Sequence, residues 1–198
     1  MNSCRLSLFI YLVFFVAFFH SSLSYAENDR FVQPYSQTEV EKVFKLIAQI
    51  QNEQSEPNEG NLRQVTVTED ELNSYIAYRI EVERSEIMKE LRLKLFKKNK
   101  IEGKIYIDLR GQELPDLLRP EMNLYFSGIL ETKENRVRLD LKSLYLEDQA
   151  IQPMVLDAVI YFGSKIQGME PFSMSDWFEL PYGIKDVETD KGRAVFYY

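Results

Sequence analysis

The middle of the chain alternates apolar and polar residues with a period of two. Leu91, Leu93 and Leu95 are separated by charged residues, and Ile105 and Ile107 repeat the pattern after a polar turn. Side chains along a strand point alternately to opposite faces, so each segment has one apolar face. The pattern predicts a β-hairpin.

A second hairpin follows, built in the same way. Leu124 and Phe126 belong to its first strand, and Val137 and Leu139 belong to its second. After Ser143 the apolar positions slip by one residue, which indicates a β-bulge or a bend. A bulge bends the strand that carries it. We therefore expect a curved antiparallel sheet.

Two capping boxes mark the starts of helices. Ser36 with Glu39 opens a helix expected over residues 36–51, and Thr68 with Glu71 opens a second one. The second helix follows a short strand, and its apolar residues recur at helical spacing. They are Leu72, Tyr75, Ile76 and Ile80.

A third helix is expected to begin at Pro153, a residue that favours the first helical position. It is apolar around most of its circumference, which predicts a buried helix. Two further strands are expected before residue 198. Helices and hairpins in this order predict an α+β fold: a curved antiparallel sheet built from hairpins and packed on one face by helices.

The chain begins with the pattern of a signal peptide. Arg5 is followed by an apolar run from Leu6 to Phe19, which is shorter than the roughly 20 residues of a transmembrane helix. Small residues favour cleavage after Ala26; the alternative is an uncleaved anchor. The expected organisation is a signal peptide (1–26), a tail (27–35), a helix (36–51), a linker (52–62) and one α+β domain (63–198).

Cleavage after residue 26 would remove Cys4 and His20, the single cysteine and the single histidine. The mature chain would then have no side chains for disulfides, thiol or histidine catalysis, or the usual zinc sites. Without Arg5, 23 of the 24 Lys and Arg residues remain against 31 Asp and Glu. This acidic balance disfavours nucleic acid. We expect neither enzymatic activity nor a cofactor or metal.

Two carboxylate clusters are candidates for a chemical site. Asp186, Glu188 and Asp190 alternate before a glycine, but the spacing fails the EF-hand pattern, so acidic residues on the wet face of a strand are the favoured interpretation. The acidic residues at 69–71 are explained by the dipole of the helix they begin.

Two apolar segments are candidates for the lining of a site for an apolar ligand. The loop between the hairpins carries three leucines, which either pack in the core or form a lid over an apolar cavity. The expected lining or lid residues are Leu114, Leu117, Leu118, Val155, Val159 and Phe162. Lysines at 97, 98 and 100 lie at a hairpin tip, where they either face solvent or contact anionic lipid.

The stretch from Val65 to Ile76 resembles the YceB-like lipoproteins and YpmS-like proteins, small exported bacterial families in which a strand enters a threonine-capped helix. The segment from Leu180 to Ile184 is also similar to their C-terminal ends. YceB-like proteins are similar in turn to the TULIP superfamily, which implies a lipid-binding tube formed by a curved sheet around a helix. The chain departs from YceB in lacking the lipobox cysteine and in having an additional N-terminal helix.

Two hypotheses follow. The first is an exported, periplasmic or secreted protein that binds a lipid or other apolar ligand in the cell envelope. The second is a structural or assembly factor that binds another exported protein. A half-barrel lipoprotein carrier similar to LolA would share the first ligand class with a different topology. An enclosed apolar space would favour ligand binding, and an exposed apolar patch on a solid core would favour a protein partner.

Overall fold

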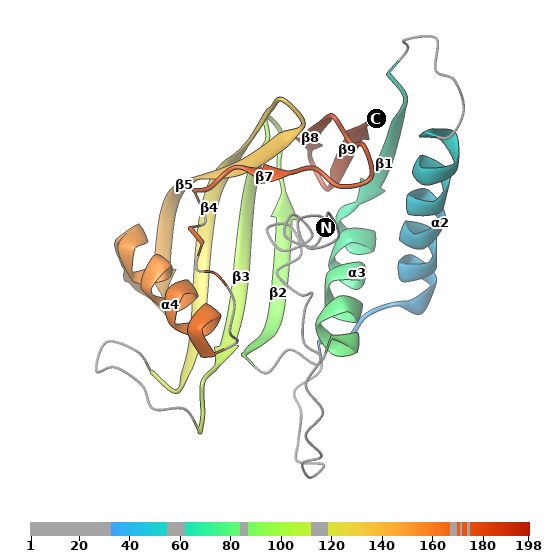
Figure 1. Cartoon of the computed structure of the whole chain (residues 1–198). Coiled ribbons are helices and arrows are strands. Elements are labelled where there is room, and N and C mark those ends of the chain that lie inside the picture. The colour runs from blue at the N-terminus through green and yellow to red at the C-terminus, as the bar shows by residue number, and fades with distance from the viewer. Residues whose placement is uncertain are drawn as a thin grey trace.

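The computed structural model describes residues 33–54, 62–83, 87–111, 119–166, 170, 172–173 and 175–198. The predicted α+β class is confirmed: a strongly curled antiparallel sheet is packed by helices (Figure 1). The predicted signal peptide and its cleavage site lie outside the described residues. The described helices are α2 (Gln37–Gln54), α3 (Glu69–Val82) and α4 (Pro153–Ile166).

The large sheet contains the two predicted hairpins. Its strand order is β2-β3-β4-β5-β6, and β7 also pairs with β5. The strands of this sheet are β2 (Met88–Leu95), β3 (Lys100–Asp108), β4 (Glu121–Lys133), β5 (Arg136–Leu146), β6 (Gln149–Ala150) and β7 (Phe178–Glu179). The strands β6 and β7 have two residues each, which is too short to show a period in the sequence, so neither strand was predicted.

The predicted bulge is confirmed. The pairing of β4 with β5 shifts so that Ser127 lies opposite Ser143, whereas Gly128 lies opposite Leu141. The extra residue is Lys142, and it keeps the apolar residues before and after it on the same face of the sheet. A bulge also increases the local twist, consistent with the curl of the sheet.

A second, smaller sheet was not distinguished by the sequence analysis. It contains β1 (Gln64–Thr68), β8 (Asp186–Asp190) and β9 (Arg193–Tyr197) in the order β1-β9-β8. The turn between β2 and β3 joins the two sheets through Asn99. The Asn99 side chain accepts a hydrogen bond from the backbone N–H of Thr189 at 2.8 Å, and its carbonyl accepts one from Leu130 at 2.8 Å.

Helix α3 forms as predicted, with a complete capping box. The Glu71 backbone N–H donates to Thr68 Oγ1 at 3.2 Å, and the Thr68 N–H donates to Glu71 Oε2 at 2.7 Å. The predicted apolar residues of α3 are all buried. Helix α2 packs along α3, and it continues to Gln54 rather than ending at residue 51, so the first residues of the predicted linker are helical.

The prediction that the third helix is buried all round was wrong. In α4, Leu156, Val159 and Ile160 are buried, but the side chains of Met154 and Tyr161 are 73% and 50% exposed. The helix lies in an outer layer over β4 and β5, so only one of its sides faces the sheet (Figure 1). Helix α4 therefore has apolar side chains on both its buried and its exposed side.

Candidate ligand-binding surfaces

The two faces of the large sheet differ in chemistry. The inner face carries the apolar half of each alternating pattern. Ile105, Leu141 and Leu146 are partly buried there, and twelve further apolar side chains are at most 8% exposed. They are Leu91, Leu93, Leu95, Ile101, Ile107, Met122, Leu124, Phe126, Leu130, Val137, Leu139 and Leu144. The outer face carries the charged and hydroxyl-bearing half. The two faces of the sheet therefore differ in polarity.

The buried side of α4 belongs to the same apolar cluster as the inner face. Val159 is 5% exposed and is part of that cluster, whereas Val155 is only half-buried. The structure thus brings one predicted lining residue, Val159, into the apolar core. The side chain of Phe162 and the predicted lid residues Leu114, Leu117 and Leu118 lie outside the described residues.

Ser164 is a polar residue on the buried side of α4. It follows Leu156 and Ile160 at four-residue intervals, and it is 0% exposed. Its hydroxyl has no hydrogen-bond partner among the described residues. Leaving a buried hydroxyl unpaired costs about 1–3 kcal/mol. Ser164 is therefore a buried polar group whose hydrogen-bond partner is not among the described residues.

The C-terminal end of α3 holds a second buried polar cluster. The guanidinium of Arg79 binds the carboxylate of Glu83, and its Nη1 donates to the Tyr75 hydroxyl at 3.0 Å. Oε2 of Glu83 is buried without a partner among the described residues. Burial raises the pKa of Glu83 to about 7, although the Arg79 guanidinium opposes this shift.

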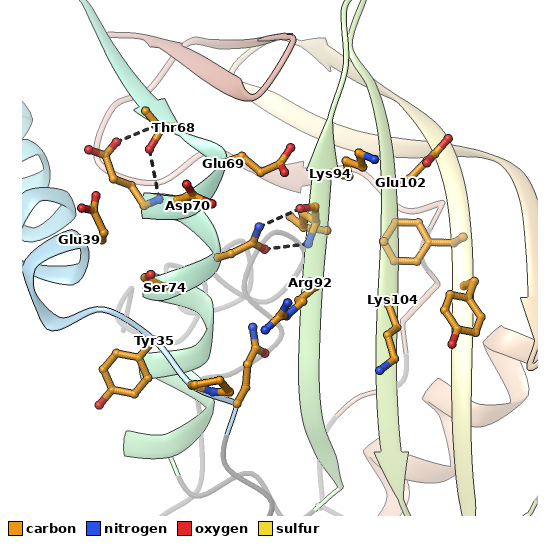
Figure 2. Close-up of a pocket in the computed structure, with 18 of the residues that line it drawn as sticks. Tyr35, Glu39, Thr68, Glu69, Asp70, Ser74, Arg92, Lys94, Glu102 and Lys104 are labelled. Carbon is orange, nitrogen blue, oxygen red and sulfur yellow. Dashed lines mark hydrogen bonds between the residues drawn. The ribbon is translucent and has the colours of Figure 1, made fainter.

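An open groove of about 1270 Å³ lies over the outer face of the large sheet, on the side away from α4. One wall comes from the N-terminal parts of α2 and α3 and carries Glu39 and Asp70. The other wall is the outer face of the large sheet, with Arg92, Lys94 and Lys104 (Figure 2). The groove therefore has an acidic helical wall and a predominantly basic strand wall.

The two walls meet where α3 lies against the edge of β2. Asn73 donates to the carbonyl of Leu93 and accepts from its N–H, both at 2.8 Å (Figure 2). Glu69 accepts from the N–H of Leu95 at 2.7 Å, and Gln33 accepts from that of Leu91 at 3.3 Å. Side chains thus supply the hydrogen bonds that a neighbouring strand would make, and this edge of the sheet is satisfied.

Four residues form a row across the strand wall, one from each of the strands β2 to β5. Arg92 pairs in register with Lys104, Lys104 with Tyr125, and Tyr125 with Tyr145. We call these four residues the outer row. All four line the groove. Beside the tyrosines, the hydroxyls of Ser127 and Ser143 lie 2.8 Å apart.

The two carboxylate clusters singled out in the sequence have structural partners. Glu69 and Glu71 make the backbone hydrogen bonds given above. On the small sheet, Asp190 binds Arg193 at 2.9 Å, Glu188 accepts from the Tyr197 hydroxyl at 3.0 Å, and Asp186 accepts from Thr132. In the part of the chain that the structure describes, no group of three or more acidic, His or Cys residues is arranged to hold a metal ion.

Sequence reasoning missed the groove and the outer row. The alternation does place Arg92 and Lys104 on a polar face, but a polar face alone is typical of any solvated sheet. The signal that could have found the site is the pair Tyr125 and Tyr145, large rings on the polar face of adjacent strands.

Comparison with known proteins does not assign the chain to a family. No protein-family model matches the chain, and no curated protein matches it either. The resemblance to YceB-like and YpmS-like proteins therefore stays a prediction. Among the helices that the structure describes, none is both long enough and apolar enough to cross a membrane.

Proposed function

We propose that the protein is a non-enzymatic binding protein for a lipid or another apolar ligand of the cell envelope. The observation that carries the proposal is the apolar inner face of a curled sheet lying under α4, a helix with apolar side chains on both sides. Ligand sites of this class are lined mainly by apolar side chains with a few polar groups that fix orientation.

Ser164 supports the same proposal. Its buried, unpaired hydroxyl lies on the side of α4 that faces the apolar cluster. A lipid whose polar group reaches Ser164 would satisfy it, while its chain replaces apolar contacts between α4 and the inner face. Such binding would stabilise the folded protein by mass action.

The test begins with protein expressed with its N-terminal segment and purified after export. Native mass spectrometry and solvent extraction should detect a co-purifying lipid, and the delipidated protein should take up the fluorescent probe N-phenyl-1-naphthylamine. Absence of both would reject the proposal.

The variant Ser164→Ala distinguishes an effect on ligand binding from an effect on folding stability. Removing the unpaired hydroxyl should stabilise the delipidated protein by about 1 kcal/mol, because the buried group no longer lacks a partner. The same change should weaken binding of a polar-headed lipid several-fold. Ser175→Ala, at an exposed position outside α4, is the control. Loss of stability in delipidated Ser164→Ala would contradict the role given to this hydroxyl.

A second candidate function is binding of another exported protein, and the exposed side of α4 favours it. Met154 and Tyr161 are seven residues apart, so they lie on the same side of the helix. Replacing both with Glu should abolish capture of an envelope protein by cross-linking while leaving uptake of the probe unchanged. Loss of probe uptake in the same variant would instead assign this side of α4 to ligand entry.

A further inference from the structure

The outer row has a fixed pair of cations at one end. The carboxylate of Glu90 is 6% exposed, and it binds Lys104 Nζ at 2.7 Å and Arg92 Nε at 3.3 Å. Two cations thus share one buried carboxylate, which leaves one positive charge locally uncompensated. The side chain of Arg92 is 54% exposed, and its two terminal nitrogens make no hydrogen bond or ion pair with a described residue. A planar guanidinium held in this way is suited to an incoming carboxylate or phosphate.

The other end of the outer row is aromatic. Tyr125 and Tyr145 are 40% and 41% exposed and lie directly opposite each other on β4 and β5. Neither hydroxyl donates a hydrogen bond to a described residue. Two adjacent exposed rings with free hydroxyls offer both an apolar surface and hydrogen bonds. The hydroxyls of Ser127 and Ser143 extend the polar part of this surface.

The size of the groove indicates a polymer rather than a small molecule. Its volume of about 1270 Å³ exceeds the range of roughly 300–1,000 Å³ that is usual for small-ligand pockets. The outer row crosses four strands, which places its ends about 14 Å apart. A ligand that spans the outer row from Arg92 to Tyr145 is therefore longer than a single sugar or amino acid.

The surroundings of the row favour a sugar polymer over a peptide. Peptides commonly add a strand to a free sheet edge, but the edge of β2 at this groove is already satisfied by Asn73, Glu69 and Gln33. Hydroxyl and amide groups line the groove, and they match the hydroxyls of sugars. The acidic helical wall, with Glu39 and Asp70, opposes an anionic chain, so the attraction comes from the strand wall alone.

We propose that the outer row binds an anionic polysaccharide. Sugar rings stack on Tyr125 and Tyr145, and a carboxylate or phosphate of the polymer binds Arg92 and Lys104. This site lies on the face of the sheet opposite α4, so it does not depend on the proposed binding of an apolar ligand. Such binding would hold the protein on a charged glycan while the inner face remains available.

Polygalacturonate, a sugar polymer with one carboxylate per ring, is the probe. Binding to the purified full-length chain is measured by isothermal titration calorimetry and by affinity electrophoresis. Neutral dextran and poly-L-glutamate serve as comparison polymers. The expected result is binding to polygalacturonate alone, weakened at least tenfold by 0.5 M NaCl because the charges are exposed.

Two double variants test the two ends of the row. Arg92→Gln with Lys104→Gln, and Tyr125→Ala with Tyr145→Ala, should each weaken binding at least tenfold. The matched controls are Lys133→Gln with Arg136→Gln, and Tyr161→Ala, which lie outside the groove and should leave binding unchanged. Thermal unfolding checks that each variant is folded.

Three outcomes would overturn the proposal. They are absence of binding to polygalacturonate, equal binding to poly-L-glutamate, and binding that survives loss of both tyrosines in a folded variant. Equal binding to the acidic peptide would assign the groove to a protein partner. Uptake of the naphthylamine probe by the outer-row variants should be normal, so failure of this proposal is distinguishable from failure of the apolar-ligand proposal.

Discussion

Helices α3 and α4 both have 14 residues and both bury apolar side chains in the main cluster, yet they are held in different ways. Helix α3 begins with a capping box and is bonded to the backbone of β2 through Asn73 and Glu69. For α4, the described polar contact to another segment is that of Asp157 with the Ser173 hydroxyl at 2.9 Å. Among the contacts of the described residues, directional bonds fix α3, whereas α4 is held mainly by apolar contact.

This difference bears on the proposed binding of an apolar ligand. Apolar contacts are not directional, so a helix held by them can shift without breaking a network of hydrogen bonds. A cover over an apolar ligand must move in this way. Helix α3, in contrast, seals a sheet edge and forms part of a groove wall, and both roles require a fixed position.

The largest expected effect separates the two helices directly. Ile76 in α3 is 0% exposed and Leu156 in α4 is 3% exposed. Ile76→Ala should lower the free energy of unfolding by about 3–4 kcal/mol, because the fixed helix cannot close the cavity. Leu156→Ala should cost about half as much, since α4 can move toward the sheet. Urea unfolding measures both, and an equal cost for the two variants would contradict the comparison.

The second prediction concerns the bonds that fix α3. Asn73→Ala leaves the N–H and carbonyl of Leu93 without their partners and should cost about 2–3 kcal/mol. Asn73→Asp keeps the acceptor for the Leu93 N–H but sets a carboxylate oxygen against the Leu93 carbonyl, so it should cost at least as much as Asn73→Ala. Hydrogen exchange at the Leu93 amide should accelerate most in Asn73→Ala. Unchanged exchange at that amide would show that Asn73 does not hold α3 to β2.

The smallest effect depends on pH and tests the C-terminal end of α3. The pKa of Glu83 is raised from 4.5 to about 7 in the folded protein, so folding favours its protonated form. Its contribution to stability is fully present below pH 4.5 and is lost as the pH rises through 7. After discounting for solvent, this loss should be about 1–2 kcal/mol.

Glu83→Gln should remove this dependence, so the difference in stability between the variant and the unchanged protein should grow from pH 4.5 to pH 7. Urea unfolding at several pH values measures it. Glu134→Gln, at the exposed turn between β4 and β5, controls for the loss of one negative charge. A difference that stays constant with pH would show that Glu83 ionises normally despite its buried oxygen.

The sequence was sufficient to predict the features that depend on neighbouring residues. The two hairpins, the bulge near Ser143 and the capping box at Thr68 follow from local spacing, and all were found in the structure. The exposure of Met154 was not predictable from composition, because an apolar helix can lie inside a core or at its surface.

The groove was also beyond local reasoning. Its walls exist because α3 is placed beside the edge of β2, and that placement depends on Asn73 reaching Leu93 across 20 residues of sequence. The outer row requires the register of three strand pairs at once. A one-residue change in any register would move one of its side chains to the inner face.

The small sheet joins segments that are far apart in the chain. Val65 of β1 lies opposite Phe196 of β9, whereas each strand of the large hairpins pairs with its neighbour in sequence. Contacts between distant residues must overcome the entropy of closing a long loop, so they form late. We therefore expect the hairpins to fold first and the pairing of β1 with β9 to be the slow step. Until that step is complete, β1 has no strand partner, so the strand that precedes α3 is not yet held in a sheet.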